Sequence, residues 1–234
     1  MPSKPEVEGP ALSAHLAALA SAQDIDQLWR AHCDRMALYG FERLLCAFTR
    51  LTRAEIERGA RGWVMLSTVP HGRAEPSDTF NDGLSDGRPG PRSWSLSRPG
   101  HHGDSHAGYT IFFRNAVSRV TGAIDLVARP GMSQRDVDRL WDLQGQEIAA
   151  LNDVFHLKLM SLPCGPYRLT DRQREMLCHV ADGHTTREIA DLLGLTEATI
   201  EKHLRLAREA LDARNTPQAV LHASLYNQIY MPKS

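Results

Sequence analysis

The stretch TTREIADLLGLTEATIEKHLRLAREAL, residues 185–211, predicts two short helices joined by a tight turn. Apolar residues recur at helical spacing on both sides of Gly194, which interrupts the pattern. Thr185 and Glu188 form a capping-box pair, and the hydroxyl of Thr196 can cap the second helix. A helix, a glycine-containing turn and a second helix are typical of helix-turn-helix units that bind DNA.

The charge of the chain does not by itself indicate a nucleic-acid partner. The 27 Lys and Arg residues face 28 Asp and Glu residues, a formal net charge of −1. From residue 167 onward nine basic residues balance nine acidic ones, whereas DNA-binding domains are usually basic. Lys202, Arg205 and Arg208 nevertheless cluster within two turns of the second predicted helix. Contact with DNA must therefore depend on where these cations lie.

The region before residue 163 predicts a mixed domain. An apolar stripe over residues 21–39 predicts a helix that ends at Gly40, and Ser133 caps a long helix that Pro163 stops. Alternating or β-rich runs predict strands at residues 43–51, 62–68, 107–115 and 121–128. The short link between the last two favours a hairpin. Residues 69–103 are rich in Gly, Pro and Ser and predict a long loop.

These patterns together predict an α+β protein of two domains. We expect an N-terminal α/β/α sandwich around an antiparallel sheet over residues 1–162, and a linker at 163–168. Residues 169–234 are expected to form an all-α helix-turn-helix domain, in which Thr170 and Gln173 make another capping box.

Composition and motifs exclude several classes of protein. No apolar run approaches the roughly 20 residues needed to cross a bilayer, and the N-terminus lacks the apolar segment of a secretion signal. The four cysteines show no C-x-x-C spacing, so we expect reduced thiols, a cytoplasmic location and no membrane association. No G-x-S-x-G motif, phosphate-binding glycine loop or paired carboxylates are found, so we expect neither enzymatic activity nor a cofactor.

One histidine-rich segment invites a metal interpretation. His101, His102, Asp104 and His106 are all potential ligands. A zinc site normally needs partners held by rigid structure, and no second cluster is evident in the sequence. We therefore expect a solvated loop and no metal site.

Residues 169–220 resemble the DNA-binding domain of the LuxR family of bacterial transcription regulators. The resemblance rests on Leu169-Thr170, Leu177, Gly183, Glu188–Ala190, Thr199-Ile200, Lys202-His203, Leu211, Asn215 and Gln218–Val220. It implies a regulator that binds double-stranded DNA as a homodimer, on a palindromic operator, and works with RNA polymerase. Residues 218–230 offer apolar side chains for part of the dimer interface, namely Val220, Leu221, Leu225 and Ile229.

In a helix-turn-helix unit the second helix enters the major groove, and the first crosses the backbone. Arg187 is therefore predicted to contact phosphate. The predicted groove-facing residues are Thr196, Glu197, Thr199, Lys202, His203 and Arg205. The family usually has Glu at the position of Gln173 and Lys at that of Ala210. Both charges are absent together here, either because an ion pair has been replaced or through drift at a surface position.

The order of elements and the segment at residues 40–51 look like the acyl-homoserine-lactone-sensing domain of the quorum-sensing branch. That branch uses a W-x-x-x-Y motif and an Asp-Pro pair for its ligand, and this chain has neither. We expect a different signal or none; the alternative is a lactone receptor with an atypical pocket. Candidate ligand-binding residues are Trp63, Trp94, Tyr109 and Asp125. Asp125 either accepts a hydrogen bond from the ligand or faces solvent on an edge strand.

Two other readings of the helix pair are disfavoured. Region 4 of a sigma factor has a similar pair, but it would need a basic helical segment where residues 40–128 predict strands. A two-component receiver domain would need an acidic pair after its first strand, where this chain has Thr52 and Arg53.

Overall fold

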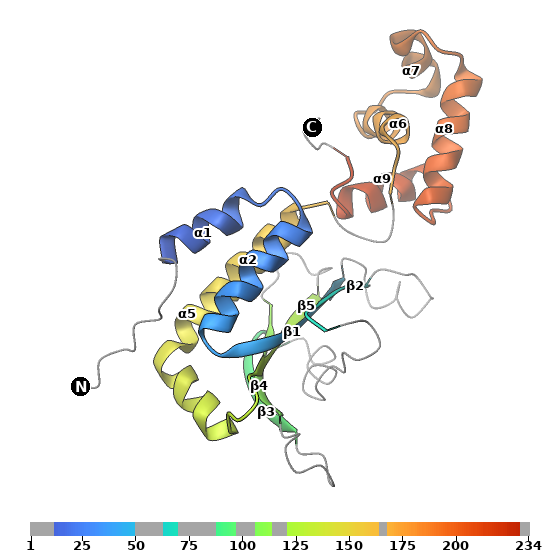
Figure 1. The fold of residues 1–234 in the computed structure, drawn as a ribbon. Coiled ribbons are helices and arrows are strands. Elements are labelled where there is room, and N and C mark those ends of the chain that lie inside the picture. The colour runs from blue at the N-terminus through green and yellow to red at the C-terminus, as the bar shows by residue number, and fades with distance from the viewer. Residues whose placement is uncertain are drawn as a thin grey trace. The chain divides into compact units, whose positions relative to one another are not determined.

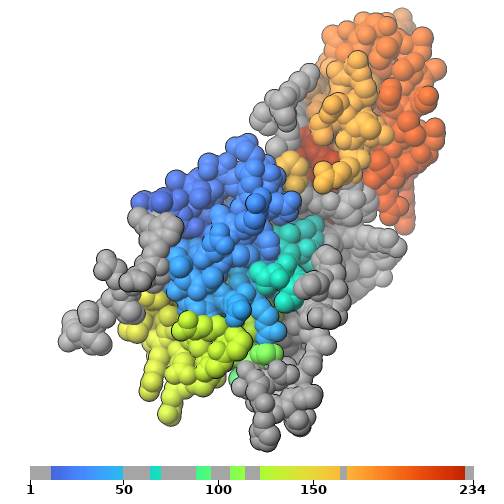
Figure 2. Space-filling model, in the orientation of Figure 1, coloured from blue at the N-terminus to red at the C-terminus, as the bar shows by residue number. Residues whose placement is uncertain are grey.

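The computed structural model describes residues 12–49, 63–69, 88–96, 106–113, 121–163 and 168–229. The chain divides into two compact units, Met1–Met160 and Ser161–Ser234. The first contains a sheet and the second is helical (Figure 1). On the face of the first unit drawn in Figure 2, α1 and α2 supply much of the surface.

Within the described residues, the sheet of the first unit has five strands in the order β2-β1-β5-β4-β3. The strands are β1 (Phe41–Thr49), β2 (Trp63–Ser67), β3 (Gly90–Leu96), β4 (His106–Phe112) and β5 (Thr121–Ala128). All neighbours pair antiparallel, so the predicted antiparallel sheet and its β4–β5 pairing are confirmed.

Strand β3 corrects the prediction of a continuous loop over residues 69–103. Residues 90–96 form an edge strand against β4, with Trp94 opposite Gly108. Pro91 lies in this strand, and an edge is where a sheet tolerates a residue without a backbone N–H. The glycine, proline and serine content of residues 69–103 is typical of a loop, and it therefore did not indicate this strand.

Three helices of the first unit pack together on one face of the sheet (Figure 1). They are α1 (Leu12–Ser21), α2 (Ile25–Leu38) and α5 (Gln134–Ser161). Asp24 caps α2 by accepting from the Gln27 amide at 2.8 Å, and Gly40 follows the helix with φ +94°. The apolar stripe predicted this helix, whereas α1 was not predicted. The described residues supply no helix for the other face, where the predicted sandwich has its second helical layer.

The second unit consists of α6 (Asp171–Ala181), α7 (Thr186–Leu193), α8 (Glu197–Ala210) and α9 (Thr216–Leu225). Local chemistry fixes the helix ends: both predicted capping boxes form, and Thr196 caps α8. Gly194 closes α7 in the left-handed region, at φ +65°. The predicted helix-turn-helix is confirmed.

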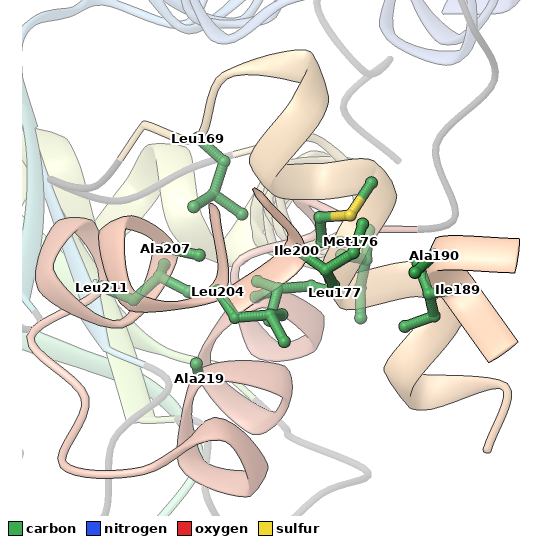
Figure 3. Packing of buried hydrophobic residues seen from close by; sticks show 12 residues of the cluster. Leu169, Met176, Leu177, Ile189, Ala190, Ile200, Leu204, Ala207, Leu211 and Ala219 are labelled. Carbon is green, nitrogen blue, oxygen red and sulfur yellow. The ribbon is translucent and has the colours of Figure 1, made fainter. Parts of the chain in front are cut away.

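A compact apolar core holds these four helices together (Figure 3). Its buried members are Leu169, Met176, Leu177, Ile189, Ala190, Ile200, Leu204, Ala207, Leu211, Ala219, Ala223 and Ile229. Ile229 was predicted to lie in the dimer interface. It is only 4% exposed and packs within its own unit, so it is not available to a second copy. Leu221, 40% exposed, keeps an outward position on α9.

Candidate functional site

Helix α8 presents one face to the core and the other to solvent. Ile200, Leu204 and Ala207 are buried against the other helices. The exposed side carries Glu197, Lys202 and Arg205. At 14 residues α8 is about 21 Å long, and a helix of this kind fits the major groove, which is about 12 Å wide.

The N-terminal end of α8 is closed by hydroxyl groups. Thr196 accepts from the Thr199 amide at 3.3 Å, and the two hydroxyl oxygens lie 2.9 Å apart. Helix α7 instead carries its own anion, because Thr185 donates to the Glu188 carboxylate through its amide at 2.7 Å and its hydroxyl at 2.8 Å. These hydrogen bonds lower the pKa of Glu188. The first turn of α8 carries a carboxylate as well, that of Glu197, which is exposed. The two helix starts therefore differ in the groups that cap them, hydroxyls at α8 and a carboxylate at α7.

The basic residues of α8 differ in whether they already bind another side chain of the protein. The Arg205 guanidinium lies 2.6 Å from the Glu209 carboxylate one turn later, and both side chains are about half exposed. Arg208 donates to the Thr216 hydroxyl at 3.0 Å and so ties α8 to α9. Lys202 is exposed and has no ion-pair partner among the described residues. Lys202 can thus bind an anion directly, whereas Arg205 must first break its ion pair with Glu209.

A hydrogen bond that the sequence does not predict connects α7 and α8. The Thr186 hydroxyl donates to the Glu201 carboxylate at 3.0 Å. It joins the first turn of α7 to α8, beside the exposed Arg187. No short-range motif could indicate it, because the partners are 15 residues apart and on different helices. His203, the remaining predicted groove residue, is half-buried on α8.

Gln173 has a local role. Its side-chain oxygen accepts from the Thr170 amide at 2.8 Å, which completes the α6 capping box. The side chain is 9% exposed. An uncharged residue can thus occupy this buried position without needing a cation at Ala210.

In the first unit, the two faces of the sheet have different chemistry. Directly opposed residues of antiparallel strands share a face. One face meets α5 and carries bulky side chains, among them Leu44, Phe48, Ile111, Ile124 and Leu126. The other face carries Ala47 and Ala123, and in the next row Asp125 opposite Thr110.

Asp125 lies on the central strand β5, between β1 and β4. It is 2% exposed and accepts a hydrogen bond from the Thr110 hydroxyl, which is fully buried. The solvent-facing alternative for Asp125 is therefore wrong, since its strand is not at an edge. A buried carboxylate is costly unless it is hydrogen-bonded, and Thr110 supplies one such bond.

The structure does not bring all the predicted ligand residues together. Tyr109 lies on the helix-covered face, stacked on Trp141 at 3.9 Å, and its hydroxyl donates to Asp138 at 3.0 Å. Burial and this hydrogen bond raise the pKa of Tyr109 to about 12. Tyr109 and Asp125 therefore face opposite sides of the sheet.

Trp94 lies on the same face as Asp125, because it opposes Gly108 in the row next to Thr110. A Cβ atom at Gly108 would lie 2.8 Å from the Trp94 ring, so glycine makes room for the indole. The indole N–H is buried without a hydrogen-bond partner among the described residues. Trp63 has its backbone in β2 opposite Thr49, and its side chain lies outside what the structure describes.

The histidine-rich segment gains no metal-binding geometry. His106 lies in β4, with its Nδ1 2.9 Å from the Arg43 guanidinium. The other three predicted ligands, His101, His102 and Asp104, lie outside the described residues. Within the described ranges no three metal-ligating side chains converge. None of the described helices is long and apolar enough to span a membrane.

Comparison with known families gives a match within the helical unit. Residues 167–223 match the family described as bacterial regulatory proteins, luxR family. The transcriptional regulatory protein DesR of Bacillus subtilis is 32% identical over 109 residues, which cover 40% of this chain and 54% of DesR. The quorum-sensing regulator RhlR of Pseudomonas aeruginosa is 36% identical over 74 residues, 32% of this chain and 30% of RhlR. The chain thus spans about half of the first relative and under a third of the second.

Among solved structures, SdiA in complex with octanoyl-rac-glycerol aligns over 94% of this chain and 96% of SdiA. The TM-score is 0.46 and the sequence identity 15%. The match to the luxR family is confined to the unit that contains α7 and α8.

Proposed function

We propose, from the premise that residues 167–223 form a DNA-binding domain of the luxR family, that the chain is a sequence-specific transcription regulator. The observation that carries the proposal is the exposed side of α8. There a helix fixed by an apolar core presents Lys202, Arg205 and the hydroxyl cap of Thr196 to solvent. Because bacterial DNA lies in the cytoplasm, the protein would act there.

Helix α8 enters the major groove in this proposal. Lys202 and Arg205 donate to guanine edges or phosphates, and Glu197 accepts from cytosine. Thr196 and Thr199 at the helix start bind a phosphate through hydroxyl and backbone groups, and His203 lies further along the same helix. Arg187, at the start of α7, contacts the DNA backbone.

The regulator would work as a homodimer on a palindromic operator and would act on RNA polymerase. Two copies related by a two-fold axis place two α8 helices about one helical turn of DNA apart. Leu221 on the outer side of α9 is the predicted interface residue that keeps clear exposure. Small-angle scattering or sedimentation of the full chain, alone and with operator DNA, measures this stoichiometry.

The sheet-containing unit would sense a small molecule, with Asp125 and Trp94 on one sheet face as contacts and Trp63 as a further candidate. Tyr109 then acts from the opposite face, by fixing α5 against β4. An acyl-homoserine lactone is the second candidate ligand. The Asp125 carboxylate favours it, because it can accept from an amide N–H.

Selection of bound fragments from a random DNA pool tests the function. We expect a recurrent motif, bound by the full chain and lost on the double change Lys202→Ala with Arg205→Ala. The matched control removes two exposed arginines from α5, Arg135→Ala with Arg139→Ala, and should keep binding. Selection of no motif, or equal loss in both double variants, would contradict the proposal.

A further inference from the structure

The hydrogen bond between Thr186 and Glu201 places a carboxylate on the surface that is proposed to meet DNA. Glu201 is exposed on α8, where it directly precedes Lys202 and lies one turn before Arg205. Its partner Thr186 directly precedes Arg187 at the start of α7. The Glu201 carboxylate therefore lies among the cations assigned to DNA, two on its own helix and one beside its hydrogen-bond partner.

The orientation of this carboxylate is already fixed. The Thr186 hydroxyl donates to one of its oxygens at 3.0 Å, and the second oxygen has no hydrogen-bond partner among the described residues. Glu197, one turn earlier on α8, is exposed and has no such tether within the described ranges. Binding orders flexible side chains at an entropic cost. Part of that ordering is already present in Glu201 before DNA arrives.

A carboxylate in the major groove can bind very few of the groups found there. It only accepts hydrogen bonds, and phosphate repels it. The base edges in this groove present two kinds of donor, the amino groups of cytosine and adenine. Adenine also presents its N7 acceptor beside the amino group, whereas the edge of cytosine presents the amino group alone. A fixed carboxylate is therefore complementary to cytosine.

We propose that Glu201 recognises a cytosine in the major groove and that Thr186 positions the carboxylate for this contact. The second carboxylate oxygen accepts from the cytosine N4 amino group while the Thr186 hydroxyl holds the first. Where guanine or thymine takes the place of the cytosine, the charge of Glu201 faces acceptors, and that repulsion disfavours the site. This inference rests on the proposed function and adds to it one specificity-determining residue and one positioning residue.

Selection from a random DNA pool, by the full chain and by Glu201→Gln, tests the inference. A glutamine amide can bind N6 and N7 of adenine together, so we expect one position of the motif to change from cytosine to adenine. The parent should prefer cytosine to adenine there at least about fivefold, and Glu201→Gln should lose or reverse that ratio. Glu175→Gln removes a carboxylate from α6 and should select the parent motif. An unchanged motif with Glu201→Gln overturns the proposal.

Variants at Thr186 test the positioning role. Thr186→Val removes the hydroxyl and should lower the cytosine-to-adenine ratio at the same position about threefold, the loss typical of one hydrogen bond. Thr186→Ser keeps the hydroxyl and should keep the parent ratio. Each ratio compares two DNAs on one protein, so a general change in affinity cancels. A purely structural Thr186 would weaken all sites alike with the ratio unchanged, and that result overturns the positioning role.

Failure of this inference differs from failure of the proposed function. If the parent chain selects no motif at all, the proposed function is contradicted and this inference is overturned with it. If the parent selects a motif whose every position is the same with Glu201→Gln, the regulator stands and the inference alone is wrong.

Discussion

Arg205 and Glu209 lie one turn apart on α8 and form an ion pair of 2.6 Å on the exposed side of that helix. The guanidinium proposed to meet DNA is therefore held by a carboxylate of its own helix. Because both side chains are about half exposed, the pair contributes little to stability, about 0–1 kcal/mol. DNA must nevertheless compete with the Glu209 carboxylate for the Arg205 guanidinium.

Glu209→Gln should strengthen DNA binding. The change frees Arg205 and removes a negative charge close to the proposed phosphate path, so we expect the dissociation constant to fall about two- to fivefold at low salt. Fluorescence anisotropy with a labelled operator measures it. Glu175→Gln breaks a comparable pair with Arg172 on α6 and should have no such effect. Weaker binding by Glu209→Gln would refute the competition.

Lys202→Ala should weaken operator binding at least about tenfold, since a charged hydrogen bond is worth about 1.5–3 kcal/mol. The melting temperature should stay within about 1 °C, because this exposed lysine has no ion-pair partner among the described residues. Anisotropy and thermal unfolding of one preparation give both values. A large drop in melting temperature would mean that Lys202 supports the fold instead.

The free energy of unfolding should fall as the pH is lowered below 6.5. Burial lowers the pKa of His32 to about 3, and also lowers the pKa of His15. The unfolded chain, with ordinary histidines, binds the extra proton first, so this stability is present above pH 6.5 and is lost below it. For His32 alone, the loss between pH 6.5 and 5 is about 1–2 kcal/mol. Urea titrations across this range measure it.

A phenylalanine at position 32 should flatten that dependence. His32 stacks on Phe155 at 4.1 Å and its Nε2 lies 3.0 Å from the Asn152 side-chain oxygen. The aromatic replacement keeps the stack and removes the titrating group. His203→Gln on α8 is the matched control and should keep the parent slope. Identical pH slopes for His32→Phe and the parent would show that His32 is not the titrating group.

Gly108→Ala should destabilise the first unit by about 2–3 kcal/mol, in the range of overpacked cores. The added methyl group would lie 2.2 Å from the Leu126 carbonyl oxygen, which belongs to the backbone of the central strand and cannot swing away. Urea unfolding of the full chain, followed by Trp fluorescence, measures the loss. A change below about 0.5 kcal/mol would show that β4 and β5 can separate at this point.

Features fixed by neighbouring residues were predictable from the sequence. The caps at Thr170, Thr185 and Thr196 each depend on a partner three residues away, so spacing alone placed the starts of α6, α7 and α8. The β4–β5 pairing was equally readable from two alternating runs joined by a short link.

Features that depend on distant partners were not predictable. Among the described strands β3 pairs with β4 alone, and its sequence GPRSWSL lacks the β-branched residues that mark a strand. The separation of Tyr109 from Asp125 depends on register, because a shift of one residue moves a side chain to the other face. The Thr186–Glu201 hydrogen bond depends on how α7 and α8 pack against each other, and no local sequence pattern predicts that packing.

The commitment of Arg205 to Glu209 and of Arg208 to Thr216 also bears on how such a protein would find its target in a genome. Nonspecific affinity for duplex DNA comes mainly from counterions that basic side chains displace. Of Lys202, Arg205 and Arg208, the last two already have partners within the protein. Binding of α8 to DNA other than the operator would therefore displace few counterions. The protein would then spend little time sliding along unrelated sequence and would locate its site mostly by repeated dissociation and diffusion through solution.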